Sequence, residues 1–401
     1  MKRQIAVLAA LGAVIAVLAL RPALPGLGAP STMATSRTAA ADLRLALNNL
    51  LAEHVALAAS ATSGALAGRM GQFNGAAAAL DANSDDVIRA VASVYGEEAG
   101  RAFGPLWKKH IGFVVNYTTG LAGKDKAKQD KAVGDLLGYT REFGAFLNSA
   151  TKSLPTDAVA ELVKMHILTL KDVIDAQGGD YPGREFAAVR KAYAHMGMIA
   201  EPLAGAIAKQ FPAKYAGSVD SSAVGLRVTL NTLLSEHVYL AARATGAALG
   251  GRQVEFRAAA AALDGNSDDI TRAIASVYGE DAGRAFGPLW KKHIGFVVDY
   301  TTGLATGDRA RQDKAVNDLL GYAREFGAFL NSATKGALPT DAVAEMVKMH
   351  ILTLKDVIDA QAAGNATKVY TDLRKALSHM AMVADPLAEG IVKQFPDRFA
   401  R

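Results

Sequence analysis

Apolar residues recur at alternating steps of three and four through almost the whole chain beyond residue 41, which is the spacing of one buried stripe on an α-helix. In the first such segment, about residues 42–68, the stripe includes Leu43, Leu47, Leu50 and Leu57. Runs with the two-residue alternation of strands are nearly absent, and Ala, Leu, Lys, Arg and Glu dominate. We therefore predict an all-α protein.

Glycine, proline and capping residues divide this pattern into helices. Gly96 is expected to end one segment, and Pro155 to open another. Pro105 is expected to kink a helix or start a new one. The string DANSDD at residues 81–86 is predicted to break a helix, with Ser84 capping the next. Long helices are expected at about residues 42–68, 97–121, 125–149, 156–178 and 184–210, with a short helix around Phe73 and Leu80.

The whole pattern occurs twice. SVYGEEAGRAFGPLWKKHIGFVVNYTTGLA in the first half returns as SVYGEDAGRAFGPLWKKHIGFVVDYTTGLA in the second, and VKMHILTLKDVIDAQ returns unchanged. A repeat of this length indicates duplication of a complete folding unit. We predict two tandem, homologous, antiparallel helical bundles, at residues 42–216 and 223–401, joined by the polar linker GSVDSS.

Residues 1–41 have a different character. Lys2 and Arg3 precede an apolar run at residues 5–20, and a Pro/Gly stretch and small residues follow it. This order is typical of an export signal, so we expect a periplasmic, extracellular or cell-envelope protein. The apolar run is shorter than the roughly 20 residues of a spanning helix, which leaves a cleaved signal peptide and a retained membrane anchor both open.

Charge and cysteine content narrow the classes of partner. The chain has 44 basic and 39 acidic residues, and four of the basic residues lie within residues 1–41, which contain no acid. The remainder is nearly neutral, so a nucleic-acid partner is not expected. The chain has no cysteine, which excludes disulfides, a lipoprotein anchor and thiolate metal ligands.

Every histidine of the first repeat has a counterpart in the second. Three of the four in each repeat occupy the apolar stripe near the middle of a predicted helix, and the fourth lies one position off the stripe. Because helix midpoints share one height in an antiparallel bundle, we expect the four imidazoles of each repeat to meet in one layer. The predicted metal ligands are His54, His110, His166 and His195, and in the second repeat His237, His293, His350 and His379.

Several buried imidazoles need partners, since each unpaired nitrogen costs about 1–3 kcal/mol. Imidazole binds copper, zinc, iron and nickel. Met198 and Met382 each lie three residues beyond the fourth histidine of their repeat, so we expect a thioether beside that imidazole. A combination of histidine and methionine ligands favours copper or haem over zinc. Glu53 and Glu236, each next to a histidine, are the nearest candidate carboxylates.

The sequence thus predicts an exported protein that binds a transition metal or haem in each repeat, for storage, sensing or electron transfer. The alternative is a structural or interaction module of the cell envelope, with an unknown protein partner and a buried histidine hydrogen-bond layer that holds no ligand. DANSDD has the opening of a calcium loop but lacks its sixth-position Gly and twelfth-position Glu. HExxH, GxSxG, P-loop and GxGxxG motifs do not occur, which argues against an enzyme without excluding one.

The strings LLAEH, SVYG, LWKKHIGF with the following YTTG, and LVKMH resemble a family of exported bacterial all-helical tandem-repeat proteins, loosely associated with copper amine oxidase-like extracellular modules. The resemblance covers both repeats. It implies export and a bacterial origin, and it carries over no catalytic residue.

Overall fold

The computed structural model describes residues 35–399, which form α-helices, one short 3-10 helix and no strand. This confirms the prediction of two similar all-α halves. The first half consists of α2 (Ala39–Leu66), α3 (Met70–Tyr95), α4 (Glu97–Ala122), α5 (Lys126–Thr151), α6 (Thr156–Gly178) and α7 (Pro182–Gln210). The second consists of α8 (Ser222–Leu249), α9 (Gln253–Tyr278), α10 (Glu280–Thr306), α11 (Arg309–Ala333), α12 (Thr340–Ala362) and α13 (Ala366–Gln394), followed by η1 (Pro396–Arg398).

Within residues 35–399, no helix is both long and apolar enough to span a bilayer. The apolar run at residues 5–20 lies outside the described part of the chain.

Helix α2 begins at Ala39, where the Thr38 side chain accepts a hydrogen bond from the Ala41 amide at 3.1 Å. Just before it, Ser36 is completely buried and its hydroxyl donates to Glu389 of α13 at 2.8 Å. Residues 35–41, which the sequence pattern placed in the targeting segment, therefore pack as part of the folded unit.

The predicted break at DANSDD is wrong, because α3 is continuous through it. Asn83 and Ser84 are completely buried inside the helix. The Asn83 side chain donates to the Leu50 carbonyl at 3.1 Å, and the Ser84 hydroxyl donates to the Leu80 carbonyl at 2.8 Å. The Asn83 side chain thus has its partner on α2, and the Ser84 hydroxyl shares a carbonyl one turn earlier in its own helix, so neither interrupts α3.

The expected boundary at Gly96 is confirmed, with a φ of +92° between α3 and α4 that favours glycine. Pro105 lies inside α4 and does not start a new helix.

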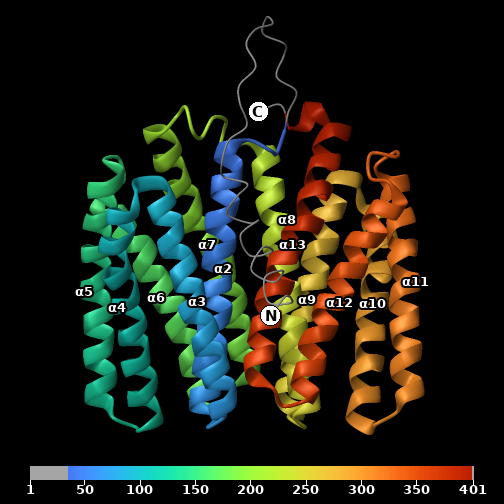
Figure 1. Ribbon diagram of the computed structural model, residues 1–401, viewed down its shortest axis with the longest axis horizontal. Coiled ribbons are helices and arrows are strands. Elements are labelled where there is room, and N and C mark those ends of the chain that lie inside the picture. The colour runs from blue at the N-terminus through green and yellow to red at the C-terminus, as the bar shows by residue number, and fades with distance from the viewer. Residues whose placement is uncertain (1–34, 400–401) are drawn as a thin grey trace, which may run out of the picture.

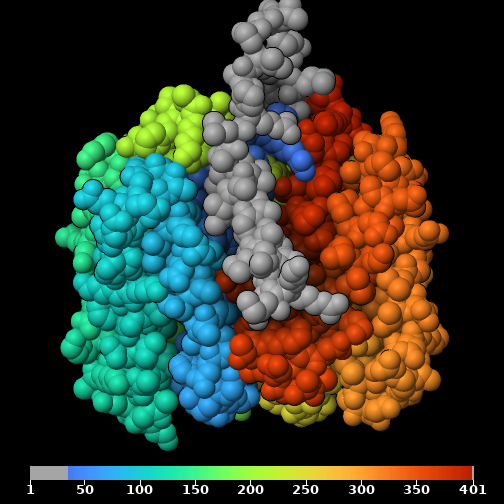
Figure 2. Space-filling model, viewed as in Figure 1, coloured from blue at the N-terminus to red at the C-terminus, as the bar shows by residue number. Residues whose placement is uncertain are grey.

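The two halves lie side by side, with α2 and α8 near the centre and α4, α5, α10 and α11 on the outside (Figure 1). Between the halves, α2 packs on α8, α3 on α13, and α7 on α9. The last two contacts are equivalent when the repeats are exchanged, so the halves are related by an approximate two-fold axis. Figure 2 shows α3 and α13 in contact on one face. One apolar core runs through both halves.

Candidate metal centre

Each repeat brings three histidines together in its core. In the first repeat they come from α2, α4 and α6, and in the second from α8, α10 and α12. One ring nitrogen from each lies within 4.8 Å of the others in its group, and every one of these side chains is buried. We call the groups triad 1 (His54, His110, His166) and triad 2 (His237, His293, His350).

The two triads have nearly the same geometry. The Nε2 atoms of His54 and His110 are 3.5 Å apart, and those of His237 and His293 are 3.3 Å apart. The ring centroids of His54 and His166 are separated by 5.9 Å, as are those of their counterparts in triad 2. Two nitrogen ligands at about 2.1 Å from a tetrahedral ion lie about 3.4 Å apart, so the closest pair in each triad already has metal-ligand spacing.

The fourth histidine of each repeat does not belong to the triad. His195 Nε2 donates to the Leu162 carbonyl oxygen at 2.9 Å, and His379 Nε2 donates to the Met346 carbonyl oxygen at 3.0 Å. Because a carbonyl oxygen only accepts, the proton sits on Nε2 and that nitrogen offers no lone pair to a metal. A position one step off the apolar stripe is enough to turn the ring toward the backbone of the neighbouring helix.

The methionines expected beside the fourth histidine are also elsewhere. Met198 and Met382 are each 61% exposed at the surface. The buried methionines are Met196 and Met380, which are 1% and 2% exposed and line cavities beside the triads. The structure therefore assembles no thioether from Met198 or Met382 with the three imidazoles.

The candidate carboxylates face the other repeat. Glu53 accepts from Asn83 at 2.7 Å and from Arg374 at 2.9 Å. Its counterpart Glu236 accepts from Asn266 at 2.6 Å and from Arg190 at 3.1 Å. Neither carboxylate belongs to a triad, because the neighbouring position on a helix points about 100° away.

Aromatic rings enclose the triads. The Trp107 ring centroid lies 5.0 Å from that of His54 and 4.9 Å from that of His110, and Tyr139 packs against His110 at 5.4 Å. Sequence reasoning did not assign these residues to the site. The residue spacing could have indicated Trp107, because it precedes His110 by three residues and so shares its helix face. Trp290 and Tyr322 repeat the arrangement in triad 2.

Burial lowers the pKa of all six triad histidines. The pKa of His54 and His237 falls well below the usual value, by desolvation and then by the neighbouring imidazoles. Desolvation lowers the pKa of His110 to about 4 against the opposing effect of the Trp107 carbonyl, and it lowers that of His166 to about 3. The corresponding residues of triad 2 have the same values. The triads are therefore neutral near pH 7, the state in which imidazole binds metals.

The second ring nitrogens are poorly paired. The Nδ1 atoms of all six triad histidines are buried without a well-formed hydrogen bond. A metal held through Nε2 would leave the Nδ1 atoms unpaired as well, so they do not distinguish a metal site from a structural layer.

Comparisons of this chain with protein-family models, with curated proteins and with solved structures found no match. The fold and the triads by themselves define a duplicated all-α bundle protein with a buried three-histidine group in each half, of a geometry that could hold a metal ion.

Proposed function

We propose that the protein binds one transition-metal ion in each repeat, through the three imidazoles of each triad, as a store or carrier of that ion. The observation that supports this most directly is the repeated Nε2 to Nε2 separation of 3.5 and 3.3 Å between uncharged imidazoles. Three neutral nitrogen donors around one point suit copper or zinc and leave a coordination position open.

Copper in its monovalent state is the ion we favour. The triads contain no carboxylate, so the full charge of a bound ion stays uncompensated in an aromatic and apolar surrounding. The energy of burying an ion rises with the square of its charge, so a monovalent ion is buried at lower energy than Zn²⁺. Met198 and Met382 are exposed and do not contribute to this preference for copper.

At triad 2 a single ion fits better than haem does. The cavity beside triad 2 has a volume of about 40 Å³, room for a few water molecules and far too little for a macrocycle. The N-terminal pattern supports export, and we propose that binding takes place outside the cytoplasm.

A structural role is the second candidate, because His54 Nε2 and His110 Nε2 are also within hydrogen-bonding distance. Equilibrium dialysis of the purified chain against Cu(I), and separately against Zn²⁺, distinguishes the two functions. Metal binding predicts two equivalents of copper per chain by elemental analysis, whereas a structural layer predicts none.

The chain offers a matched set of variants. His110→Gln should reduce the stoichiometry to one, and so should His293→Gln. His195→Gln changes a buried histidine outside the triad and should leave two equivalents. If His195→Gln loses as much metal as His110→Gln, or if the unaltered chain retains no ion, the proposal fails.

A further inference from the structure

The two repeats differ in the space beside their triads. In the first repeat a cavity of about 370 Å³ extends from the triad 1 imidazoles to Tyr95 and Tyr215 at the end of the bundle where α7 terminates. The corresponding cavity of the second repeat has about 40 Å³. A volume of 370 Å³ lies in the range of small-molecule binding sites, about 300–1,000 Å³.

Substitutions between the repeats account for part of this difference. Val87 and Val91 line the cavity from α3, and their counterparts on α9 are Ile270 and Ile274. Each isoleucine adds a methylene to the same wall of the smaller cavity. The large cavity is thus a property of one copy of a duplicated bundle and is not inherent in the fold.

At the end of the cavity away from triad 1, one polar group in the wall has no partner. Tyr215 lines the cavity, is 3% exposed, and its hydroxyl is buried without a hydrogen bond. The equivalent residue of the second repeat is Phe399, which lacks the hydroxyl. An unpaired buried hydroxyl costs about 1–3 kcal/mol, which a ligand oxygen accepting its proton would recover.

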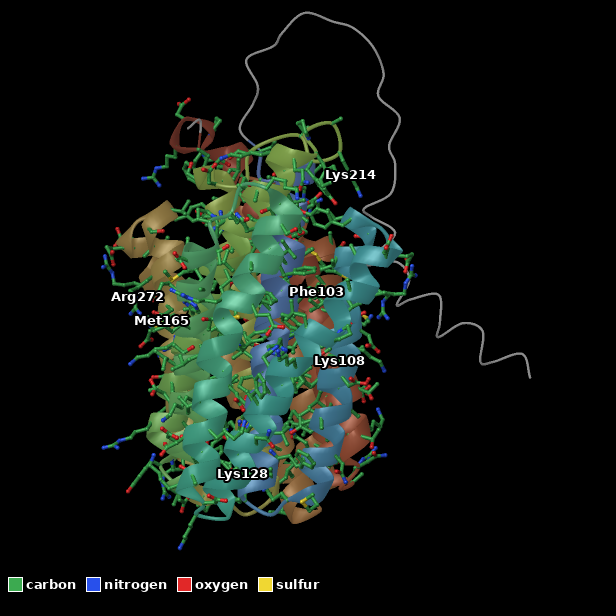
Figure 3. All side chains as sticks on the ribbon, turned by 90° about the vertical axis from the view of Figure 1, so that its left-hand side faces the viewer. Phe103, Lys108, Lys128, Met165, Lys214 and Arg272 are labelled. Atoms are coloured by element: carbon green, nitrogen blue, oxygen red, sulfur yellow. The ribbon has the colours of Figure 1, made fainter. Side chains whose placement is uncertain are left out.

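A positive charge lies over the ring of the same tyrosine. The Lys214 ammonium is 5.3 Å from the centre of the Tyr215 ring and donates to the Ser93 carbonyl at 2.7 Å. Figure 3 shows Lys214 at the end of the bundle; Phe103, which lines the cavity, lies further along it. The cavity therefore has a hydroxyl in its wall at one end, with the exposed Lys214 ammonium outside the lining at that same end, and an apolar wall along its length.

We propose that the first repeat binds a monocarboxylic acid with a linear hydrocarbon tail, such as a medium-chain fatty acid. The carboxylate accepts from the Tyr215 hydroxyl near the Lys214 ammonium, and the tail lies along Val87 and Val91 toward Phe103. The second repeat binds no such ligand, because its smaller cavity lacks both the hydroxyl and the space.

Isothermal titration calorimetry with decanoate tests this on the full chain in the presence of a chelator. We expect one equivalent of decanoate per chain. Val87→Ile combined with Val91→Ile, which copies the wall of the second repeat, should weaken binding at least tenfold. Tyr215→Phe should weaken decanoate about tenfold and 1-decanol much less, since it removes a hydrogen bond to a charged group.

The matched control is Ile270→Val combined with Ile274→Val, which should leave the affinity of the first repeat within twofold. Each variant is checked by its helical circular dichroism and melting temperature, because added methylenes in a cavity should not unfold the bundle. The proposal is overturned if decanoate does not bind, if two equivalents bind equally, or if the Val→Ile variant binds as the unaltered chain does. Binding that requires added copper would place the carboxylate at triad 1 and would also overturn it.

If the unaltered chain binds decanoate but no copper, only the metal proposal is refuted.

Discussion

At the residue scale, the triads concentrate polar groups that folding leaves unsatisfied. Of the sixteen buried side-chain atoms without a well-formed hydrogen bond in the described residues, six are the Nδ1 atoms of the triad histidines. Each unsatisfied atom costs about 1–3 kcal/mol of folding free energy. Such an arrangement is typical of a functional site, where stability is given up for binding.

Acidification should destabilise the metal-free protein in a defined window. In the unfolded chain the triad histidines bind protons near pH 6.5, whereas burial lowers the folded pKa of His110 and His293 to about 4. Between these values the unfolded state binds more protons, so stability rises with pH and is lost as the pH falls from about 6.5 toward 4. Urea denaturation in chelator at pH 7.5, 6.5 and 5.5 measures this loss.

Carboxylates ordinarily titrate near pH 4, so a change in the free energy of unfolding above pH 5 comes mainly from the histidines. Replacing His110 and His293 together by Phe should make the dependence shallower, because it removes two of the six triad histidines whose pKa burial lowers. A free energy of unfolding that stays constant between pH 7.5 and 5.5 would contradict the expectation.

The periodicity located three of the four histidines of each repeat because they sit on the stripe that faces the core. It could not show that His195 lies outside the triad. A shift of one position turns a side chain by about 100° around the helix, which is enough to direct the His195 ring to the Leu162 carbonyl. It also could not place Glu53, whose partner Arg374 lies in the other repeat. Contacts between repeats leave no trace in the spacing within one helix.

At the element scale, two close helix contacts require glycine. A Cβ on Gly144 of α5 would lie 2.4 Å from the Thr156 carbonyl oxygen at the start of α6, and Gly327 meets Thr340 in the same way at 2.5 Å. These glycines let two consecutive helices approach closely near the turn that joins them. The sequence contained the glycines, but helical periodicity alone does not distinguish them from exposed ones.

Gly144→Ala should therefore destabilise the protein, by about 1–3 kcal/mol, because backbone must move to accept the methyl group. Gly138→Ala on the same helix is the control. No atom lies within 4 Å of a Cβ at Gly138, and alanine should stabilise the helix there by about 0.5–1 kcal/mol. Thermal and urea denaturation of both variants provide the measurement, and equal effects would contradict the packing argument.

Helix ends were predictable where glycine or a capping side chain marks them, as at Gly96 and at Asp125, which caps α5 by accepting from the Lys128 amide. The error at DANSDD arose because Asn83 and Ser84 have the composition of a cap. Asn83 instead donates to the Leu50 carbonyl of α2, and Ser84 to the Leu80 carbonyl one turn earlier in its own helix. Local composition cannot reveal the partner of Asn83, which lies on another helix.

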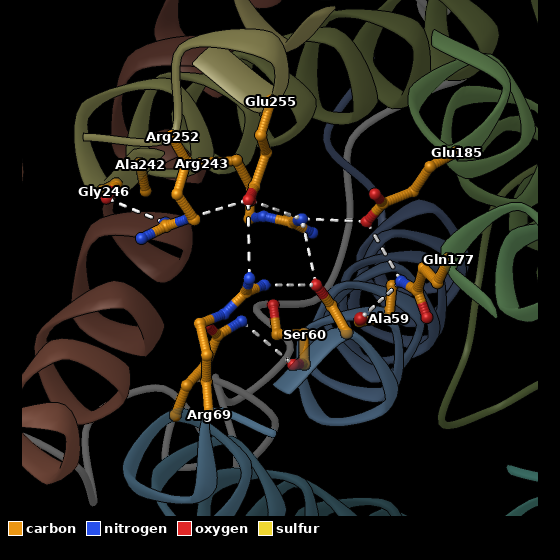
Figure 4. Close-up of polar contacts among 12 residues, drawn as sticks. Ala59, Ser60, Arg69, Gln177, Glu185, Ala242, Arg243, Gly246, Arg252 and Glu255 are labelled. Atoms are coloured by element: carbon orange, nitrogen blue, oxygen red, sulfur yellow. Dashed lines mark hydrogen bonds and ion pairs between the residues drawn. The ribbon is translucent and has the colours of Figure 1, made fainter. Parts of the chain in front are cut away.

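At the scale of the whole molecule, the interface between repeats contains one charged cluster that has no symmetric counterpart. Arg243 of α8 is buried and donates to Glu185 of α7 at 2.8 Å and to Glu255 of α9 at 3.2 Å (Figure 4). The position equivalent to Arg243 in the first repeat is Ser60. The approximate two-fold axis is therefore broken by a charged cluster centred on an arginine that only the second repeat supplies.

Arg243→Ala should be among the most destabilising substitutions in the chain. It leaves Glu185 and Glu255 buried without their shared cation, a change that typically costs about 3–5 kcal/mol. Arg272→Ala removes an ion pair whose arginine side chain is 70% exposed and should change stability by about 0.5 kcal/mol or less. Urea denaturation compares the two variants, and equal losses would show that the buried cluster contributes no more than a surface pair.

The two repeats should unfold together. One apolar core continues through both, and the stacked rings of Tyr193 and Tyr239, 5.9 Å apart, join α7 to α8 within it. Trp107 and Trp290 are the only tryptophans, one beside each triad, so Trp290→Phe leaves a reporter for the first repeat and Trp107→Phe one for the second. Each reporter is followed by fluorescence in urea, against the far-ultraviolet circular dichroism of the same variant.

In each variant the fluorescence and circular dichroism transitions should coincide, because neither half can expose its share of the common core without exposing that of the other. Adding Arg243→Ala to both variants weakens the joint between repeats and should shift all transitions to lower urea. Separate midpoints for the two reporters before that substitution would mean that each repeat is a self-sufficient domain. The charged cluster would then orient the repeats without being required for their folding.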